Sequence, residues 1–445
     1  MKVSQFSAHS VFFAVIFLLL IPVSAQAVTR VVTEGQSIAD ALAISTYGDS
    51  VKVAVGEYRQ SGLEMPTGVY LGALSDDPLD YPRLIGDSGE TIIHCEDVDG
   101  ATKIAKLIFE GDFSIMDGIA TRGHGIHTVN STVTISHCSF LGLKASYGGA
   151  IFVGKGVAPL IRSCHFDFNE ALATGGAISA VGSRDLTLDH CLFEGNTATA
   201  GGSVLNVALG ASALVTHCTM VGNGEAMQGD IQAWASGSVE VTNCIMADSQ
   251  GRPCYGDYAS TPDYHCSDLT GSAGGDWIGA LAGQAEIQGN ISLPPMFCGD
   301  QSDVSPYTLD EDSPCTGDAN PGCGIMGAFE IGCDGSAGTE GSEFVQADED
   351  ALPTATRLRG NYPNPFNPLT TIAFDLKQSG QAAVDVYDLA GRLVRNLHSG
   401  VLAAGTHEVM WNGRGPDGRM SAAGIYFFRL KTETVIDTQR MTLVK

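Results

Sequence analysis

A cysteine returns at a nearly fixed interval through the middle of this 445-residue chain. The five positions are separated by 26, 27, 27 and 26 residues, at Cys138, Cys164, Cys191, Cys218 and Cys244. Apolar residues usually accompany each of them, five and three positions before the cysteine and two positions after it. A fixed period of this length is typical of a solenoid, in which one short structural unit stacks on the next.

The spacing within one repeat predicts its secondary structure. Alternating apolar residues such as Leu186 and Leu188 indicate a strand with one buried face. The step of three from Leu188 to Cys191 breaks this alternation, so the chain must bend at a corner before a second strand. A turn such as Glu194-Gly195-Asn196 follows, and a third strand opens at Gly-Gly. Three short strands per repeat predict an all-β fold, a right-handed parallel β-helix whose like residues stack at ~4.8 Å.

Two alternatives compete with this interpretation. A leucine-rich repeat requires L-x-x-L-x-L spacing, which is absent. The residue before each cysteine, or before the equivalent position in looser copies at Cys95 and Gly118, is His94, Asp117, His137, Ser163, His190, His217 or Asn243. We expect corner residues with left-handed backbone there. The alternative is a metal site at stacked His190 and His217, but zinc needs convergent ligands rather than one exposed column.

The first 27 residues read as a signal peptide. Lys2 supplies a positive end, an apolar run extends from Val11 to Val23, and Ala25-Gln26-Ala27 is an A-x-A cleavage site. We expect a mature chain from Val28 that has no transmembrane segment and permits disulfides. The formal net charge of −26 argues against nucleic acid or an anionic membrane as a partner.

Several stretches of residues 28–335 resemble known β-helix families. The opening "SIADALAISTYGDSVKVAVGEY" resembles pectate-lyase-like proteins, in which a short helix caps the coil. The motifs "GGAI" and "FEGN" resemble the repeats of chlamydial polymorphic outer-membrane proteins. The segment from Cys266 to Cys333 resembles the closing part of exported bacterial β-helix proteins. Disulfides are expected among Cys254, Cys266, Cys298, Cys315, Cys323 and Cys333, with Cys254–Cys266 a plausible pair.

The C-terminal part of the chain differs in composition. Residues 336–355 are rich in Gly, Ser and acidic residues and read as a linker. Residues 356–445 alternate apolar and polar residues between turns, which predicts a small β-sandwich. Phrases such as "NYPNPFNP" and "AGIYFFRL" resemble the type IX secretion sorting domain and the immunoglobulin-like domain of flagellar hook-capping proteins. This resemblance implies transport across an outer membrane by a secretion machinery, to the cell surface or the medium.

The sheet that opens at Gly-Gly is where a binding or catalytic site is expected. Its outward columns are predicted to be Ala150, Ala177, Ser203 and Asp230, and then Phe152, Ser179, Leu205 and Gln232, with Trp234 beside them. One carboxylate and no base would equip this face badly for the lyase or glycosidase chemistry that the resemblance implies. Phe152, Leu205, Gln232 and Trp234 could instead form a strip that binds a sugar or a protein.

Other acidic residues offer weaker candidates. Asp167 and Glu194 should lie one repeat apart and could bind Ca²⁺ or act as a retaining pair, although solvated turn residues are the more common case. Asp97 and Asp99 also suggest Ca²⁺, but a bare D-x-D-G is common in turns. The nearby basic residues do not fall in one column: Lys144, Lys155, Arg162 and Arg184.

These observations favour an exported β-helix with a binding, adhesive or structural role toward glycans or proteins. The alternative function is a polysaccharide lyase or glycoside hydrolase whose site gathers carboxylates with an Arg or Lys in one groove. A purely mechanical spacer is a third interpretation. No catalytic residue can be assigned from the sequence, and Ca²⁺ is the one cofactor that it suggests.

Overall fold

The computed structural model describes most of the chain. It covers residues 27–444 except 87–88, 112–119, 225–228, 257–259, 300–304, 321, 334–355, 363–365, 367–369, 390, 403, 412, 416–419 and 433. The predicted signal peptide, apart from Ala27, and the predicted linker lie outside the described residues. Within the described residues, no helix is both long enough and apolar enough to cross a membrane.

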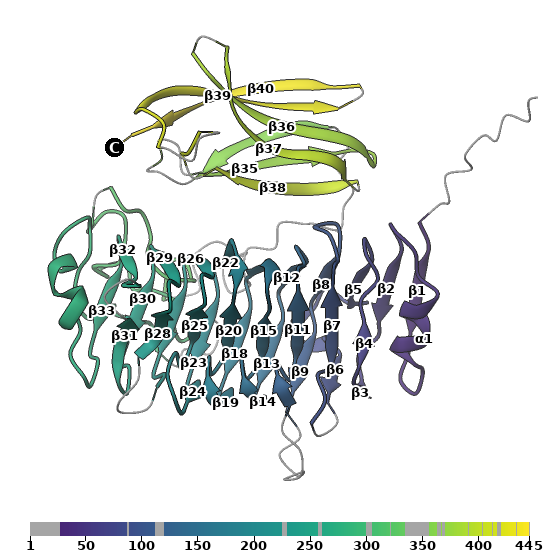
Figure 1. The fold of residues 1–445 in the computed structure, drawn as a ribbon, viewed down its shortest axis with the longest axis horizontal. Helices are drawn as coiled ribbons and strands as arrows, with labels where there is room; N and C mark the ends of the chain where they lie inside the picture. The colour runs from purple at the N-terminus through teal and green to yellow at the C-terminus, as the bar shows by residue number, and fades with distance from the viewer. Residues whose placement is uncertain are drawn as a thin grey trace, which may run out of the picture.

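Three long parallel sheets wind into a single coil, as the repeat predicts (Figure 1). Sheet A has ten strands: β1 (Thr29–Val32), β2 (Ser50–Val53), β5 (Tyr70–Ala73), β8 (Lys103–Ala105), β12 (Thr134–Ser136), β17 (Leu160–Arg162), β22 (Leu186–Asp189), β26 (Ser212–Thr216), β29 (Ser238–Thr242) and β32 (Asp263–His265). Sheet B has nine: β3 (Glu57–Arg59), β6 (Arg83–Ile85), β9 (Ile108–Glu110), β13 (Ser139–Leu141), β18 (His165–Asp167), β23 (Leu192–Glu194), β27 (Thr219–Val221), β30 (Ile245–Ala247) and β33 (Asp268–Thr270).

Sheet C completes the coil. Its eight strands are β4 (Leu63–Glu64), β7 (Ile93–Glu96), β11 (Ile126–Val129), β15 (Ile151–Val153), β20 (Ile178–Val181), β25 (Leu205–Ala208), β28 (Gly229–Trp234) and β31 (Arg252–Gly256). Short strands lie between sheets B and C, in sheet D: β10 (Ala120–Arg122), β14 (Lys144–Tyr147), β19 (Glu170–Thr174) and β24 (Thr197–Ala198). β16 (Gly156–Val157) and β21 (Ser183–Arg184) pair in the turn after sheet C.

The corner between sheets A and B is built as the sequence predicts. His137, Ser163, His190, His217 and Asn243 all have φ between +47° and +55°. A residue with left-handed backbone interrupts the alternation of side chains at the corner, so the side chain of the following cysteine points into the coil. The five repeat cysteines are buried, which confirms the predicted inner column.

The copy around Cys95 was wrongly placed. Cys95 and His94 lie in β7 of sheet C, not at the corner. In that turn of the coil the corner residue is Lys106, with φ of +60°, and Leu107 takes the cysteine's place in the core. The second loose copy, with Asp117 and Gly118, lies outside the described residues.

Stacked side chains hold successive turns together inside the coil. Phe109, Phe140, Phe166 and Phe193 form a column with ring centroids 4.7–4.8 Å apart and planes within 9° of parallel. A second column holds the buried amides of Asn169, Asn196 and Asn223. The Nδ2 of Asn169 donates to the Oδ1 of Asn196 at 2.9 Å, and Asn196 donates to Asn223 at 3.0 Å. These bonds satisfy amides that would be costly to bury alone.

The Gly-Gly pairs serve a tight approach between neighbouring turns. Gly175 has φ of +74°, and a Cβ on Gly176 would lie 2.2 Å from the carbonyl oxygen of Ser203. Any larger residue at position 176 would push the next turn away, so the Gly-Gly pair is required by the close packing of neighbouring turns.

A short helix closes the N-terminal end of the core. In α1 (Ile38–Ala43), the Ser37 hydroxyl accepts the Asp40 N–H at 3.0 Å and caps the first turn. The buried side chains of Ile38 and Leu42 cover the first turn of the coil. This helix agrees with the resemblance to capped β-helix proteins.

The closing segment folds back over the outer face of sheet B. After the 3₁₀ helix η2 (Gly279–Gln284), Leu309, Cys315 and Met326 pack against Ile245 and Ala247 of β30. Two disulfides fasten it, Cys266–Cys323 and Cys298–Cys333. A second 3₁₀ helix, η1 (Pro78–Asp80), lies in an earlier turn.

Four of the six cysteines in this region pair, but the proposed Cys254–Cys266 pair was wrong. Cys254 and Cys315 keep free thiols. Cys254 is aligned with Ile231 in sheet C, whereas Cys266 has φ of +47° and stands at the corner between sheets A and B. The Cys315 thiol is buried and donates to Asp268 Oδ2 at 3.3 Å.

The C-terminal part is a sandwich of two antiparallel sheets (Figure 1). One holds β34 (Arg357–Tyr362), β35 (Thr370–Leu376) and β38 (Gly405–Trp411). The other holds β36 (Gly380–Asp388), β37 (Leu393–Leu402), β39 (Gly424–Thr432) and β40 (Ile436–Leu443). Its separate core includes Phe374, Val386, Trp411 and Phe428.

Candidate functional site

The predicted outward column of sheet C is misaligned at one residue, and Phe152, Ser179 and Gln232 in it are buried. Phe152 is aligned with Ser179, and Ser179 with Asn206 rather than Leu205. The pair Gly201-Gly202 lies one position earlier in the coil than Gly175-Gly176, because Gly201 is aligned with Thr174. Since the side-chain period of a strand is two, this difference of one residue places Leu205 in the core. Leu205 therefore cannot belong to a binding strip.

The other predicted column is buried rather than exposed. Ala150 and Ala177 belong to the core, and Ser203 donates a hydrogen bond of 2.7 Å to Asp230. Burial raises the pKa of Asp230 to about 7, although hydrogen bonds with Ser203 and Ser249 act in the opposite direction. Asp230 is a buried carboxyl, 1% exposed to solvent.

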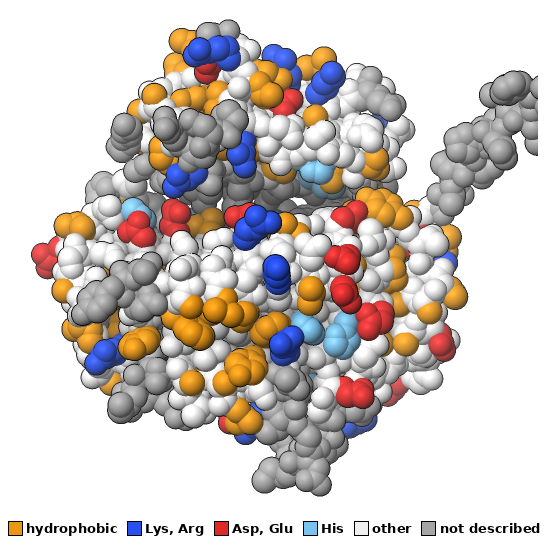
Figure 2. Space-filling view, viewed as in Figure 1, with side chains coloured by type: hydrophobic (Ala, Val, Ile, Leu, Met, Phe, Trp, Pro, Cys, Tyr) orange, Lys and Arg blue, Asp and Glu red, His pale blue; other side chains and the backbone are white. Residues whose placement is uncertain are grey.

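A groove that the sequence interpretation missed lies at the N-terminal end of sheet C. It encloses about 490 Å³. Its charged and titratable lining consists of Glu64 on β4, Glu90 before β7, His94 on β7, Arg122 on β10 and His127 on β11. Figure 2 shows two histidines among acidic side chains on this face of the coil, with basic side chains close by. Two carboxylates, two imidazoles and a guanidinium therefore converge on one hollow.

Strand register explains this convergence. Glu64 is aligned with His94, and His94 with His127, so the three side chains occupy adjacent strands on one face. The column continues directly into Phe152. Arg122 reaches the same place from sheet D, where its guanidinium carbon lies 5.0 Å from the centroid of the Phe152 ring.

His127 lies at the centre of the groove. Its ring contacts His94 edge-on at 5.7 Å and Phe152 at 5.3 Å. Burial, with the nearby His94 and Arg122, lowers the pKa of His127 to about 4. The Nε2 of this neutral imidazole is buried and has no hydrogen-bond partner. A polar group of a ligand would satisfy it.

Beyond the groove, the amides of Asn206 and Gln232 are buried, and exposed aromatic rings follow at the far end of the sheet. The indole Nε1 of Trp234 donates to Asn206 Oδ1 at 3.0 Å, and Asn206 in turn donates to Ser179. Trp234 is 42% exposed and Tyr255, aligned with Gln232, is 45% exposed. At ~4.8 Å per strand, the face from His127 to Tyr255 is roughly 24 Å long.

The comparisons with known proteins agree with this architecture. Residues 91–262 match the family of the right-handed β-helix region, and residues 368–435 match the FlgD Ig-like domain. The chain is a right-handed β-helix with a C-terminal FlgD Ig-like domain. No curated protein matches the sequence.

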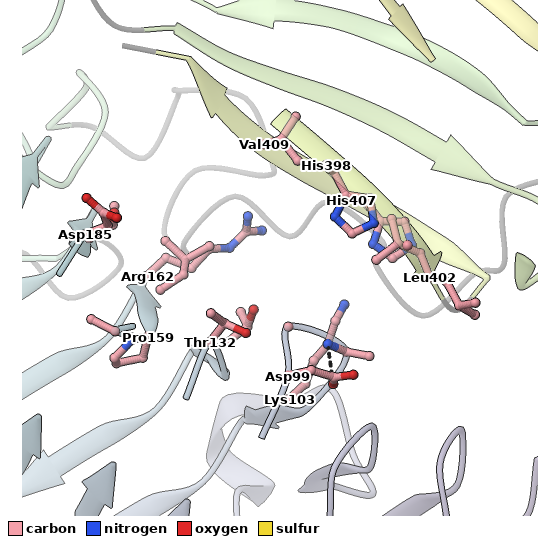
Figure 3. Close-up of a pocket in the computed structure, with 18 of the residues that line it drawn as sticks. Asp99, Lys103, Thr132, Pro159, Arg162, Asp185, His398, Leu402, His407 and Val409 are labelled. Atoms are coloured by element: carbon pink, nitrogen blue, oxygen red, sulfur yellow. Dashed lines mark hydrogen bonds between the residues drawn. The ribbon is translucent and has the colours of Figure 1, made fainter. Parts of the chain in front are cut away.

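A second cavity, of about 610 Å³, lies between the β-helix and the FlgD Ig-like domain. Figure 3 shows Lys103, Thr132 and Arg162 on the β-helix side, with His398 and His407 on the side of the Ig-like domain. The carboxylates of this cavity, on Asp99 and Asp185, lie apart, with Arg162 and Thr132 between them (Figure 3). The N-terminal groove brings its charged groups into a smaller volume, so we take it as the candidate site.

The remaining predicted residues lie elsewhere on the β-helix. Asp167 and Glu194 do lie side by side, but on the outer face of sheet B. Asp97 accepts a hydrogen bond from Asn130 at 2.7 Å, and Asp99 accepts one from the Ala101 N–H at 3.1 Å. Both are therefore occupied as turn residues. Lys144 pairs with Glu170 at 2.8 Å, outside the groove.

His190 and His217 stack at 4.7 Å with nearly parallel rings. Asp189 Oδ1 lies 2.7 Å from His190 Nδ1 and 3.9 Å from His217 Nδ1. Thr216 Oγ1 also lies 2.9 Å from His217 Nδ1. Each nearby ring nitrogen thus has an oxygen neighbour already, which agrees with a structural role for these corner residues.

Proposed function

We propose that this protein binds a neutral glycan along the outer face of sheet C. The observation that carries this proposal is the groove at His127, with the exposed rings of Trp234 and Tyr255 farther along the same sheet. Sugars present hydroxyls at their edges and apolar C–H faces. Carboxylates, imidazoles and guanidinium suit the hydroxyls, and flat aromatic rings suit the faces.

The charge of the protein favours a neutral ligand. The formal net charge is −26, and the groove itself holds Glu64 and Glu90. An anionic polymer such as polyuronate would meet an unfavourable field, whereas a neutral polysaccharide would not.

Replacing Trp234 by alanine should weaken glycan binding at least ten-fold, because the variant loses the tethered ring that a sugar face would cover. A glycan array identifies the ligand, and calorimetry with the neutral oligosaccharide that binds best measures the loss. Phe168→Ala is the matched control, since Phe168 is 65% exposed on the turn after sheet B. No neutral glycan bound by the wild type, or equal affinity in Trp234→Ala, would contradict the proposal.

Glycan cleavage is a second candidate function, favoured by the composition of the groove. Glu64 and Glu90 line the same groove as a neutral imidazole and an arginine, and glycoside cleavage uses a pair of acid and base groups. Products released from the bound oligosaccharide, and their loss in Glu64→Gln, would favour this activity over binding alone.

We further infer that the protein is exported and that the FlgD Ig-like domain directs its final sorting. The support is the signal-like start of the sequence, the two disulfides and the motifs of the last 90 residues. Deleting residues 356–445 should leave the β-helix folded but retained within the cell envelope. Cell fractionation and antibody labelling of intact cells measure this, and unchanged surface display would refute the sorting role.

A further inference from the structure

The outer face of sheet B carries a second cluster of potential ligands. His165 and Asp167 are two positions apart on β18, so their side chains point to the same face. Glu194 is aligned with Asp167 on the next strand, β23. One ligand atom from each of the three residues lies within 4.8 Å of the others.

Two atoms of this cluster are buried without a hydrogen bond. The His165 Nε2 and the Asp167 Oδ1 lie 3.1 Å apart, yet neither has a hydrogen-bond partner of acceptable geometry. Buried polar atoms are costly when unsatisfied. An ion placed between them would satisfy both.

The surroundings of the two carboxylates also favour a cation. Asp167 is aligned with Leu141 on one side, and Glu194 with Val221 on the other. No lysine or arginine of the described chain forms an ion pair with either carboxylate. Like charges on directly paired strands repel each other, and apolar neighbours reduce the screening of that repulsion.

The closing segment covers this cluster. The Tyr307 hydroxyl makes a hydrogen bond with Glu194, and burial together with that bond raises the pKa of Tyr307. Tyr307 packs edge-on against Phe297, beside the Cys298–Cys333 disulfide. The cluster therefore lies where a segment distant in the sequence meets the β-helix.

We propose that His165, Asp167 and Glu194 bind a divalent transition-metal ion, of the zinc or manganese class, under the closing segment. One imidazole nitrogen and two carboxylate oxygens suit these metals, whereas Ca²⁺ prefers oxygen ligands alone. Tetrahedral zinc holds its ligand atoms roughly 3.3 Å apart. The three ligand atoms therefore need to move closer together by side-chain movement only. The bound ion would stabilise the contact between the closing segment and sheet B.

Zinc titration of the full-length, tag-free protein tests this site after treatment with a chelator. We expect one zinc ion per chain and a higher melting temperature with zinc. His165→Ala and Glu194→Gln should each weaken binding at least ten-fold and abolish the thermal shift. Co²⁺ should give the visible absorption of a low-symmetry site in the wild type and lose it in His165→Ala.

His190→Ala is the matched control, because Asp189, His190 and His217 form the other cluster of potential ligands among the described residues. That variant should bind zinc as the wild type does. Zinc binding that disappears in His190→Ala, or that persists unchanged in both His165→Ala and Glu194→Gln, would overturn the assignment. Ca²⁺ binding as tight as that of zinc and insensitive to His165→Ala would do so as well.

Discussion

Replacing Phe166 by alanine is expected to lower the free energy of unfolding of the β-helix by about 3–5 kcal/mol. Phe166 is fully buried, and its ring stacks between Phe140 at 4.8 Å and Phe193 at 4.7 Å. The variant would leave a cavity in the middle of the column, and the turns on either side cannot close it because their spacing is fixed by backbone hydrogen bonds. Chemical denaturation followed by circular dichroism measures the loss.

Phe168→Ala provides the control two residues away. Phe168 lies on the turn after β18, is 65% exposed and has φ of +49°. Its loss should change the unfolding free energy by less than about 1 kcal/mol. Equal destabilisation by both substitutions would show that the phenylalanine column does not hold the coil together.

The column at Phe166 was predictable from the sequence because its cause is local and repeated. The cysteine period, the apolar spacing around it and the corner before it follow from a backbone path that repeats in every regular turn. His190 and His217, with φ of +49° and +47°, show that even the backbone region of the corner could be inferred.

Irregular turns account for the parts that could not be predicted. His94 and His127 are 33 positions apart in the chain, whereas His127 and Phe152 are 25 apart, yet all three are aligned in sheet C. The earlier turn of the coil is longer, so a search with a period of 26 or 27 misses the groove. The repeated Ile-His pair, at Ile93-His94 and Ile126-His127, was the one signal that could have revealed it.

The prediction that Leu205 faces outward was wrong for a related reason. The motif "GGSV" was aligned with "GGAI", but Gly201 is aligned with Thr174, so Leu205 is paired with Ile178 rather than with Ser179. In a strand a shift of one residue exchanges the inner and outer faces completely. Disulfide partners were less predictable still, since Cys323 reaches Cys266 only through the return of the closing segment across sheet B.

Arg122 decides whether the groove is a binding site, and its replacement by alanine should weaken glycan binding about 100-fold. Among the described residues that line the groove, Arg122 supplies the guanidinium, a cationic hydrogen-bond donor that lies against Phe152. The substitution therefore removes hydrogen bonds to the ligand and uncovers the Phe152 ring. Calorimetry with the oligosaccharide selected on the array measures the change. Arg184→Ala, at the turn after sheet C, is the control and should bind as the wild type does.

The pH dependence of binding tests the role of His127 in the same groove. With a pKa of about 4, His127 stays neutral from pH 8 to pH 5, so its own protonation should lower the affinity only as the pH approaches 4. Protonation would place a second positive charge beside Arg122 and remove the acceptor at the unpaired Nε2. Because this pKa lies below that of an unfolded histidine, the same proton also destabilises the fold as the pH falls from about 6.5 toward 4, so circular dichroism must accompany each measurement. His217 has a pKa of about 4 as well but lies at the corner between sheets A and B, so His217→Ala should keep the wild-type profile, whereas His127→Ala should lower affinity at every pH and lose the acid-side fall.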